Sequence, residues 1–355
     1  MRNKLAIVII PLLILLINHT HAQTGFEQLV QAGPADASKL INAYGRPLFK
    51  GFGLGMNSGW TNTAKTLGLF HFDLRVTASA VIVPTSERTF DVTKIGLSSN
   101  IRPDNPKEVM AQSFSGNKNI TGPTMNIYDG KGDKLTSFNM PRGIVESIVP
   151  SPQLQLTIGL FQNTDVTVRA IPKVRFDKNI GSVTQFGLGI KHNVIQDFAG
   201  SGTQMPFDLA LAFGYSRLNY SKSLNLQPAS FAEPSSPDQV KDFSTQELYG
   251  HFDNYLFQAI FSKQLSFFTP YISLGYNISK TEVGLKGNYP IINGITDGEL
   301  SYTTFTDPVS LNLTHVKDLR ADIGFQLKFP ILTLYGSYGY TESYSMVNAG
   351  VGLGF

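Results

Sequence analysis

The chain has 355 residues, a formal net charge of +3 and no cysteine. Without cysteine it can form neither disulfides nor thiolate metal sites, and so small a charge gives no electrostatic basis for binding nucleic acid. Glycine (33), phenylalanine (25) and tyrosine (14) are abundant, whereas tryptophan occurs once. This mixture favours tightly packed strands with an aromatic interfacial belt over helices.

Residues 1–22 have the features of a secretory signal peptide. Two cations precede an apolar run of 13 residues (5–17), and a polar stretch then ends at Ala22. The run is shorter than the ~18–20 residues that a spanning helix needs. We therefore expect cleavage after Ala22, which leaves 333 residues (355 − 22) with a charge of +1, because Arg2 and Lys4 are lost.

Residues 23–49 differ from the rest of the chain, because their apolar positions have helical spacing: Ala37, Leu40, Ile41 and Tyr44. Gly45 and Pro47 then form a plausible helix stop. The sequence thus predicts a short N-terminal helix, too small to be a domain. It would sit at the periplasmic rim of a barrel or plug it.

From residue 50 to residue 355, alternation of apolar and polar residues dominates. Runs of 11–15 alternating residues exceed the typical strand of about 5–6 residues in soluble proteins and match the ~9–11 tilted residues that cross a bilayer. The pattern favours a transmembrane β-barrel over a soluble β-sandwich. We expect twelve strands, near 50–60, 68–83, 88–97, 152–161, 165–176, 182–193, 206–220, 250–263, 268–283, 318–329, 331–342 and 345–355.

The connections agree with this topology. The three long ones, 98–151, 221–249 and 284–317, all follow odd-numbered strands, as expected for outer loops when both ends of the barrel are periplasmic. Fourteen strands remain an alternative, because residues 299–316 could add a hairpin.

The last predicted strand ends on Phe355, which resembles the C-terminal signal that the barrel-assembly machinery reads in outer-membrane proteins. Since a bilayer tolerates no free strand edge, this strand should pair with the first one, 50–60. The inner wall at that seam would consist of small residues: Gly53, Gly55, Gly350 and Gly352. This wall is the predicted docking surface for the N-terminal helix, unless the glycines only ease strand curvature.

Residues 50–84, with the motifs "NSGW", "NTAK" and an "FD" strand, resemble an uncharacterised family of outer-membrane barrels from Bacteroidetes-type bacteria. The resemblance extends to the helix and, more loosely, to the C-terminal strands. It implies a barrel in the cell outer membrane but no activity. In layout the chain is also distantly similar to the long-chain fatty-acid transporter family, whose N-terminal segment plugs the lumen, although the Asn-Pro-Ala motif of that plug is missing.

The polar strand faces predict the lumen lining: Arg75, Arg169, Lys173, Arg175, Lys191, Arg320 and Lys328, with Asp73, Asp208 and Asp322. A basic lumen would favour anions; alternatively, these charges pair in a closed lumen. About eight strands are filled by their own side chains, whereas 16–18 leave a channel. Twelve strands therefore predict a narrow, plugged or gated passage.

No chemistry beyond this stands out. His71 with Asp73, and His251 with Asp253, share strand faces but lack a nucleophile, and no residues have metal-ligand spacing. The sequence predicts a monomeric outer-membrane channel or transporter for small solutes, without cofactor or metal, whose partners are membrane lipid and the assembly machinery. The alternatives are a closed structural or surface-interaction barrel that acts through its outer loops and, less favoured, a lipid-modifying enzyme.

Overall fold

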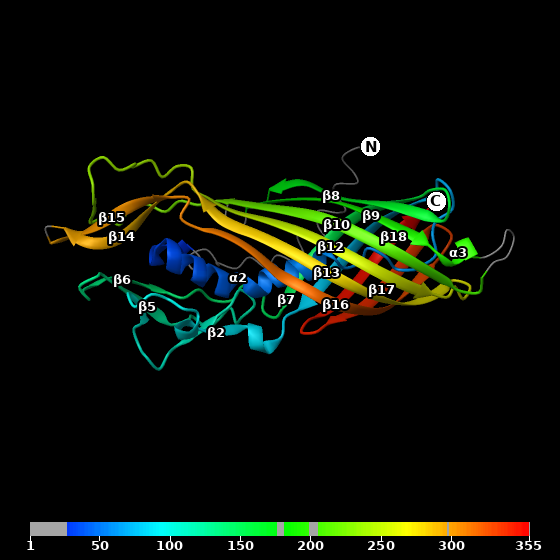
Figure 1. Cartoon of the computed structure of the whole chain (residues 1–355), viewed down its shortest axis with the longest axis horizontal. Helices are drawn as coiled ribbons and strands as arrows, with labels where there is room; N and C mark the ends of the chain where they lie inside the picture. The colour runs from blue at the N-terminus through cyan, green and yellow to red at the C-terminus, as the bar shows by residue number, and fades with distance from the viewer. Residues whose placement is uncertain (1–26, 176–180, 199–204, 297, 355) are drawn as a thin grey trace.

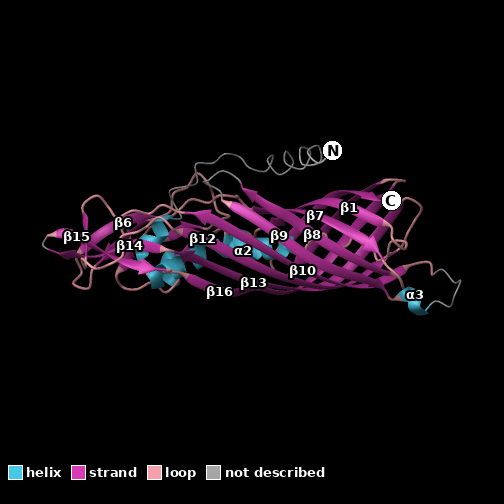
Figure 2. Cartoon of the chain, turned by 90° about the horizontal axis from the view of Figure 1, so that it is seen from above, coloured by secondary structure: helices cyan, strands magenta, loops and turns pink. Residues whose placement is uncertain are grey.

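The computed structural model describes residues 27–175, 181–198, 205–296 and 298–354. In it, antiparallel strands close into a barrel (Figures 1 and 2). β1 pairs with both β7 and β18, which closes the wall. The ten barrel strands are β1 (Phe72–Ile82), β7 (Ile148–Gly159), β8 (Thr164–Arg175), β9 (Ser182–Asn193), β10 (Asp208–Ser223), β12 (Glu247–Ser262), β13 (Phe268–Lys286), β16 (Ser310–Lys328), β17 (Leu332–Thr341) and β18 (Ser345–Gly354). The predicted signal peptide and Phe355 lie outside the described residues.

The two ends of the barrel differ. At the turn end the connections are short, 160–163, 263–267 and 329–331, and one longer connection begins with the short helix α3 (Ile195–Phe198). At the loop end lie the long connections 83–147, 224–246 and 287–309. These fold into small sheets of their own, formed by β2 (Thr89–Asp91) with β4 (Met110–Gln112), by β3 (Ile101–Pro103), β5 (Thr124–Tyr128) and β6 (Lys134–Asn139), and by β11 (Ala232–Pro234), β14 (Asn288–Thr296) and β15 (Glu299–Thr306).

The polarity of the barrel is inverted relative to a soluble protein. Large apolar side chains on the outer face are exposed, for example Leu274 (70%) and Leu319 (76%), whereas polar side chains such as Ser216 and Asn254 are fully buried inside. This is the arrangement of a membrane-spanning barrel. Among the described residues, no helix is long and apolar enough to cross a membrane.

The predicted strand number, twelve or fourteen, is wrong, because the barrel has ten. Residues 50–60 belong to a helix and its C-terminal turn, and residues 88–97 form only the short β2 and a turn of 3-10 helix (Val92–Lys94). The extra wall hairpin expected within 299–316 is also wrong: residues 299–306 form β15, which pairs with β14 in the loop-end cap, and residues 310–316 belong to the barrel strand β16. The long connections still follow odd-numbered strands. Because both 50–60 and 88–97 drop out of the count, the number of every strand after residue 97 falls by two and stays odd or even as before.

The helix α2 (Pro34–Met56) lies inside the barrel (Figure 1). It follows a 3-10 helix, η1 (Glu27–Ala32), which contacts β6 and β14 at the loop end. From there α2 runs toward the turn end, where residues 57–71 lead into β1. The chain therefore passes through the whole barrel before it forms the first strand of the wall, and residue 27 lies at the opposite end from residue 354. The first and last strands of the wall, β1 and β18, begin and end, respectively, at the turn end.

Gly45 and Pro47 do not end the helix as predicted. Proline removes one backbone hydrogen bond from a helix interior, but α2 is surrounded by the wall and by loops, and the packing outweighs that loss. The apolar residues of its first half, including Leu40 and Tyr44, join one core with loop residues such as Met125 and Tyr289.

Candidate functional site: the plugged lumen

The second half of α2 touches the wall closely because it carries glycine at alternate positions. A Cβ atom built on Gly51 would lie 2.6 Å from the Val149 side chain, and one on Gly53 would lie 2.4 Å from Ser279 Oγ. These contacts come from β7 and β13, so different parts of the wall enclose the helix. The glycines thus explain the misassigned strand: their period of two reflects close approach to the wall, not strand alternation.

Arg169 of β8 holds the C-terminal end of α2. Its side chain is fully buried and donates hydrogen bonds to the carbonyls of Met56 (2.7 Å) and Ser58 (2.9 Å) and to Gln155 Oε1 (3.0 Å). The guanidinium also lies 3.7 Å from the ring centroid of Trp60. A cation at a helix C-terminus interacts favourably with the exposed carbonyls and the helix dipole. Arg169 therefore joins the wall to the end of the helix.

Trp60 is fitted to the wall by glycines. Cβ atoms built on Gly187, Gly189 and Gly214 would lie 3.2, 2.7 and 2.7 Å from its indole ring. These positions on β9 and β10 leave a flat inner surface that receives the indole. The single tryptophan of the chain therefore packs closely against the wall, and the Arg169 guanidinium lies over its ring.

The segment after α2 is bound to the wall by polar contacts. Arg75 donates to Asn62 Oδ1 (3.1 Å), Arg320 donates to Ser58 Oγ (3.0 Å), and Lys191 donates to the carbonyl of Lys65 (2.7 Å). Further contacts join Asn57 to the carbonyl of Tyr255, Thr61 to Gln258, and the Ala64 N–H to Ser262 Oγ. We call residues 27–71 the plug, because they fill the lumen from one end to the other.

Most buried charges of the lumen are paired, but among the described residues neither Arg169 nor Asp208, which accepts a hydrogen bond from Asn193 (2.7 Å), has an ion-pair partner. Three ion pairs join Arg75 to Asp73 (2.5 Å), Lys191 to Asp165 (3.0 Å) and Arg320 to Asp322 (2.6 Å). Among the described residues no carboxylate pairs with Arg169, whose partners are carbonyls, an amide and the indole. The structure thus favours the paired network over the uniformly basic lumen that we also considered.

The structure separates the predicted lumen residues into two groups. Arg75, Arg169, Arg320, Asp73, Asp208 and Asp322 are buried inside, and Lys191 is half-buried. Lys173 and Arg175 are exposed beyond a break in the alternation, so their assignment to the lumen is wrong. Lys328 is also exposed, although it keeps the inward register of Arg320 and lies opposite the buried Thr333. A bulge between Ile171 and Val174 interrupts the alternation in β8, and Lys328 lies at the turn-end limit of β16.

The four glycines predicted to form the docking wall lie on two different elements, the helix α2 and the strand β18. Gly53 and Gly55 lie on the helix and not on the wall, since a Cβ atom on Gly55 would lie 2.6 Å from Ser151 Cβ. Gly350 and Gly352 lie on β18, where their nearest side chains are Tyr335 and Asp73 of the wall. The predicted pairing of the last strand with residues 50–60 is wrong, because β18 pairs with β1, with Gly350 opposite Thr77.

The sequence interpretation missed Asp165, Gln155 and Trp60 as lumen residues. Gly187 and Gly189, in alternate positions of one strand, were a usable signal for an indole contact. Neither predicted His–Asp pair is assembled: Asp73 pairs with Arg75, and His251 contacts Asn219. Among the described residues, no group of three His, Asp or Glu side chains could hold a metal ion.

At the loop end, Glu87 fastens the plug to the wall. Its carboxylate accepts hydrogen bonds from Lys50 of α2 (2.7 Å) and from the Tyr344 hydroxyl in the β17–β18 turn (2.7 Å). Although burial raises the pKa of Glu87, the hydrogen bonds from Lys50 and Tyr344 outweigh it and hold this pKa below its ordinary value. The stabilisation is therefore complete above the ordinary pKa of a glutamate and is lost as the pH falls through the lowered value.

We therefore expect acidification to weaken this contact. In single-channel recordings, plug openings should become severalfold more frequent below about pH 4, and Glu87→Gln should show frequent openings at neutral pH with little further change on acidification. Glu299→Gln, at the exposed tip of the β14–β15 hairpin, is the matched control. An unchanged pH profile in Glu87→Gln would contradict this role.

Gly53→Ala should destabilise the plug. In an exposed helix this change stabilises by about 0.5–1 kcal/mol, but here the new methyl group would lie 2.6 Å from Ser279 Cβ. Shifting the helix to relieve such overlap costs roughly 1–3 kcal/mol. Thermal unfolding should show a lower midpoint for Gly53→Ala and no decrease for Gly130→Ala, where nothing lies within 4 Å. A higher midpoint for Gly53→Ala would show that the helix is not against the wall.

Comparison with known proteins assigns the chain to a protein family. The whole sequence, residues 1–355, matches the model of a family of unknown function, DUF6588. The chain belongs to this family. Membership of an uncharacterised family is thereby confirmed, whereas the bacterial group stays a prediction. No curated protein matches this DUF6588 chain.

Several solved structures resemble this DUF6588 protein. Ail of Yersinia pestis is 9% identical with a TM-score of 0.25, and the alignment covers 81% of this chain and 100% of Ail. The translocator domain of the autotransporter NalP from Neisseria meningitidis is 12% identical (TM-score 0.27, 92% and 99% covered). The Pseudomonas putida toluene transporter TodX is 9% identical (TM-score 0.22, 88% and 97% covered). At these scores the likenesses carry no argument about function.

Proposed function

We propose that this DUF6588 protein is an outer-membrane channel that its own plug holds closed. The loop end faces the outside and the turn end faces the periplasm, since long connections lie outside in such barrels. Small solutes pass when the plug shifts. The observation that carries this proposal is Arg169: a wall residue, fully buried, whose hydrogen bonds go to the plug and to Gln155 rather than to an acid.

The contacts of the plug support a reversible closure. Around residues 57–65 it is held mainly by single hydrogen bonds to wall side chains, and water can replace such bonds when the plug moves. Residues such as Gln153, which donates to the carbonyl of Gly55 (2.6 Å), would then line a polar passage. No disulfide could lock the plug, because the chain has no cysteine.

Arg169 also sets the expected solute class. When the plug leaves it, Arg169 becomes a cation without a carboxylate partner, while Arg75, Lys191 and Arg320 keep their paired acids. This charge makes the part of the passage beside the plug's helix end locally cationic, which favours anions there, while the Asp208 carboxylate, which forms no ion pair among the described residues, lies on β10 near the turn end. The proposed cargo is therefore small polar solutes, neutral or anionic.

Planar-bilayer recording of the purified, refolded chain tests this function. We expect rare unit openings whose reversal potential in a salt gradient shifts toward anions. Silence of both the full chain and a chain that lacks α2, with heat-modifiable migration as proof of folding, would contradict the channel. That outcome would favour the surface-interaction barrel, whose loop-end sheets would then be the part to investigate.

A further inference from the structure

The wall of the barrel has an opening beside β16 toward the loop end. β16 pairs with β13 along residues 310–327, but its pairing with β17 begins only at Arg320. Among the described residues, therefore, no strand covers the second backbone edge of residues 310–319. The neighbouring strands β17 and β18 already turn back at residues 342–344, and Figure 1 shows α2 in view between β16 and β2. The opening thus leads from the side of the barrel to the plug.

Solvent reaches the plug through this opening. Arg46, in the middle of α2, is exposed, although its neighbours Gly45 and Pro47 are buried. Arg46 is close enough to Glu87 and to His315 of β16 to interact electrostatically with both, which places it between the two sides of the opening. A helix that the wall enclosed on every side could not expose a side chain at this position.

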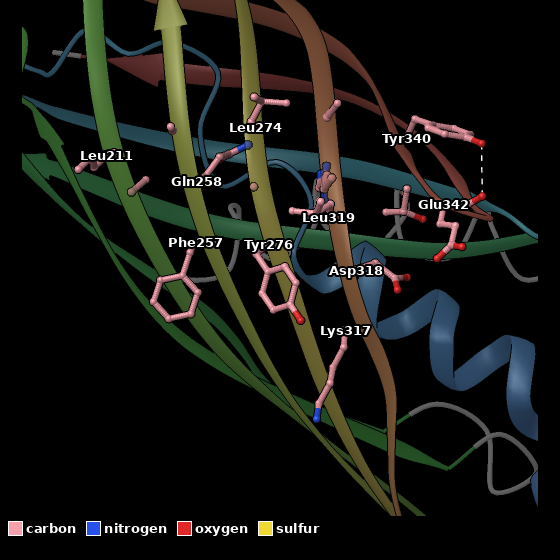
Figure 3. Close-up of a pocket in the computed structure, with 16 residues that line it drawn as sticks. Leu211, Phe257, Gln258, Leu274, Tyr276, Lys317, Asp318, Leu319, Tyr340 and Glu342 are labelled. Carbon is pink, nitrogen blue, oxygen red and sulfur yellow. Dashed lines mark hydrogen bonds between the residues drawn. The ribbon is translucent and has the colours of Figure 1, made fainter.

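The opening is lined by charged and polar side chains from the plug and the wall. On one side, Glu87 accepts hydrogen bonds from Lys50 and from the Tyr344 hydroxyl (2.7 Å each). On the other side, Asp318 of β16 interacts electrostatically with Lys50. Figure 3 shows Asp318 and Glu342 beside α2. Such a lining suits water and polar solutes rather than acyl chains.

Two polar atoms near the opening lack hydrogen-bond partners within the described chain. One is His315 Nε2, on a ring whose centroid lies 5.5 Å from that of Phe49, and the other is Asn42 Oδ1, one helical turn before Arg46. Both atoms are buried, and a buried polar atom without a partner costs free energy. Ordered water is therefore their expected partner, and the opening is where it enters.

The opening lies outside the hydrocarbon layer. The outward side chains of β16 are apolar from Leu319 toward the turn end, whereas Lys317, Thr314 and Asn312 are exposed polar residues toward the loop end. A change from apolar to polar outward residues marks the membrane boundary on a barrel strand. The opening beside residues 310–319 therefore faces water at the membrane surface, and not lipid.

The axial route at the loop end, in contrast, is closed by an apolar core. Leu40 and Tyr44 of α2 are buried there with Met125 and Tyr289 of the loops. We propose that solutes enter the lumen sideways, through the opening between β16 and Glu87, and then pass along the plug beneath the loop-end cap. This inference rests on the proposed channel function and adds the position of its entrance.

Cysteine labelling of the full chain tests whether the opening exists. A membrane-impermeant maleimide added to intact cells should label Arg46→Cys severalfold faster than Ala37→Cys, which is buried on the same helix. The chain has no native cysteine that could react instead. Heat-modifiable migration confirms that both variants are folded. Equally slow labelling of the two variants would show that the wall is closed at Arg46 and would overturn the proposal.

A bulky polyethylene-glycol maleimide tests the route in planar-bilayer recordings. Attached to Glu342→Cys, in the exposed turn beside the opening, it should reduce the conductance of the openings severalfold. Attached to the control Glu299→Cys, at the exposed tip of the β14–β15 hairpin, it should have little effect. Equal effects at both positions, or a larger effect at the hairpin tip, would overturn lateral entry in favour of entry through the cap.

Failure of the channel itself has a different signature. Silence of the unmodified variants, together with fast labelling of Arg46→Cys, would contradict conduction and therefore any solute route, although the wall is open. Slow labelling of Arg46→Cys in a chain that conducts would contradict only the lateral entrance. The two results are distinguishable because labelling does not require conduction.

Discussion

A chain that lacks residues 27–56 should conduct persistently, whereas the full chain is closed most of the time. The wall does not need α2 for closure, because β1 pairs with β18 over residues 73–82 and with β7 over residues 72–82. Without the helix, the polar inner faces of the strands are free to be hydrated. Planar-bilayer recording should show stable unit steps for the deletion variant and rare openings for the full chain.

The deletion variant must first be shown to be a barrel. Heat-modifiable migration serves as that check, since it reports the closed sheet and not the plug. A folded deletion variant that stays electrically silent would contradict plugging by α2. It would mean that the loops or the wall itself close the lumen.

Arg169→Ala should have the largest effect of any single substitution in the lumen. Hydrogen bonds to a charged group contribute about 1.5–3 kcal/mol each, but the desolvation cost of the buried guanidinium offsets part of this gain. A net weakening of plug binding by about 2 kcal/mol would raise the open fraction roughly thirtyfold. Single-channel recordings measure this fraction directly.

Arg175→Ala is the matched control, because Arg175 lies on the same strand but is exposed. It should leave the open fraction unchanged. Arg169→Lys should lie between wild type and Arg169→Ala, since lysine keeps the charge but not the planar fork that reaches two carbonyls at once. Equal open fractions in Arg169→Ala and Arg175→Ala would show that Arg169 does not hold the plug in the lumen.

Much of the wall could be predicted from the sequence. Alternation located all ten barrel strands. It does so because each wall position faces either lipid or the lumen and is therefore either apolar or polar. It failed at residues 50–60, where alternating glycines serve helix–wall contact inside a narrow lumen. Local spacing cannot distinguish the two causes, since the second depends on atoms of β7 and β13 that are distant in sequence.

The luminal charges were predictable only where alternation is regular. Arg75, Arg169 and Arg320 lie in unbroken stretches and point inward as expected. In β8 the bulge after Ile171 broke the alternation, and Pro172, a residue that strand interiors tolerate mainly at bulges, was the local signal that the alternation count passed over. The pairing of charges was also beyond prediction, because the Lys191–Asp165 pair depends on the register between β8 and β9.

A disulfide test addresses the central claim, that α2 lies in the lumen with its glycines against β13. The absence of native cysteine makes the double variant Gly53→Cys/Ser279→Cys unambiguous, and the two Cβ atoms, 2.6 Å apart when built, need to separate by only about 1 Å to reach the ~3.5–4.5 Å of a disulfide. We predict that oxidation in intact membranes will link these positions, visible as a gel shift that reductant reverses, and will suppress channel openings.

The pair Ala37→Cys/Gly350→Cys, which the sequence alone had suggested, should stay unlinked. Ala37 precedes Met56 by 19 residues, about 28 Å of helix, whereas Gly350 lies beside Thr77, near Gly59. Linkage of the first pair alone is the predicted result. Linkage of the second pair, or failure of the first, would contradict the threading of the plug through the barrel.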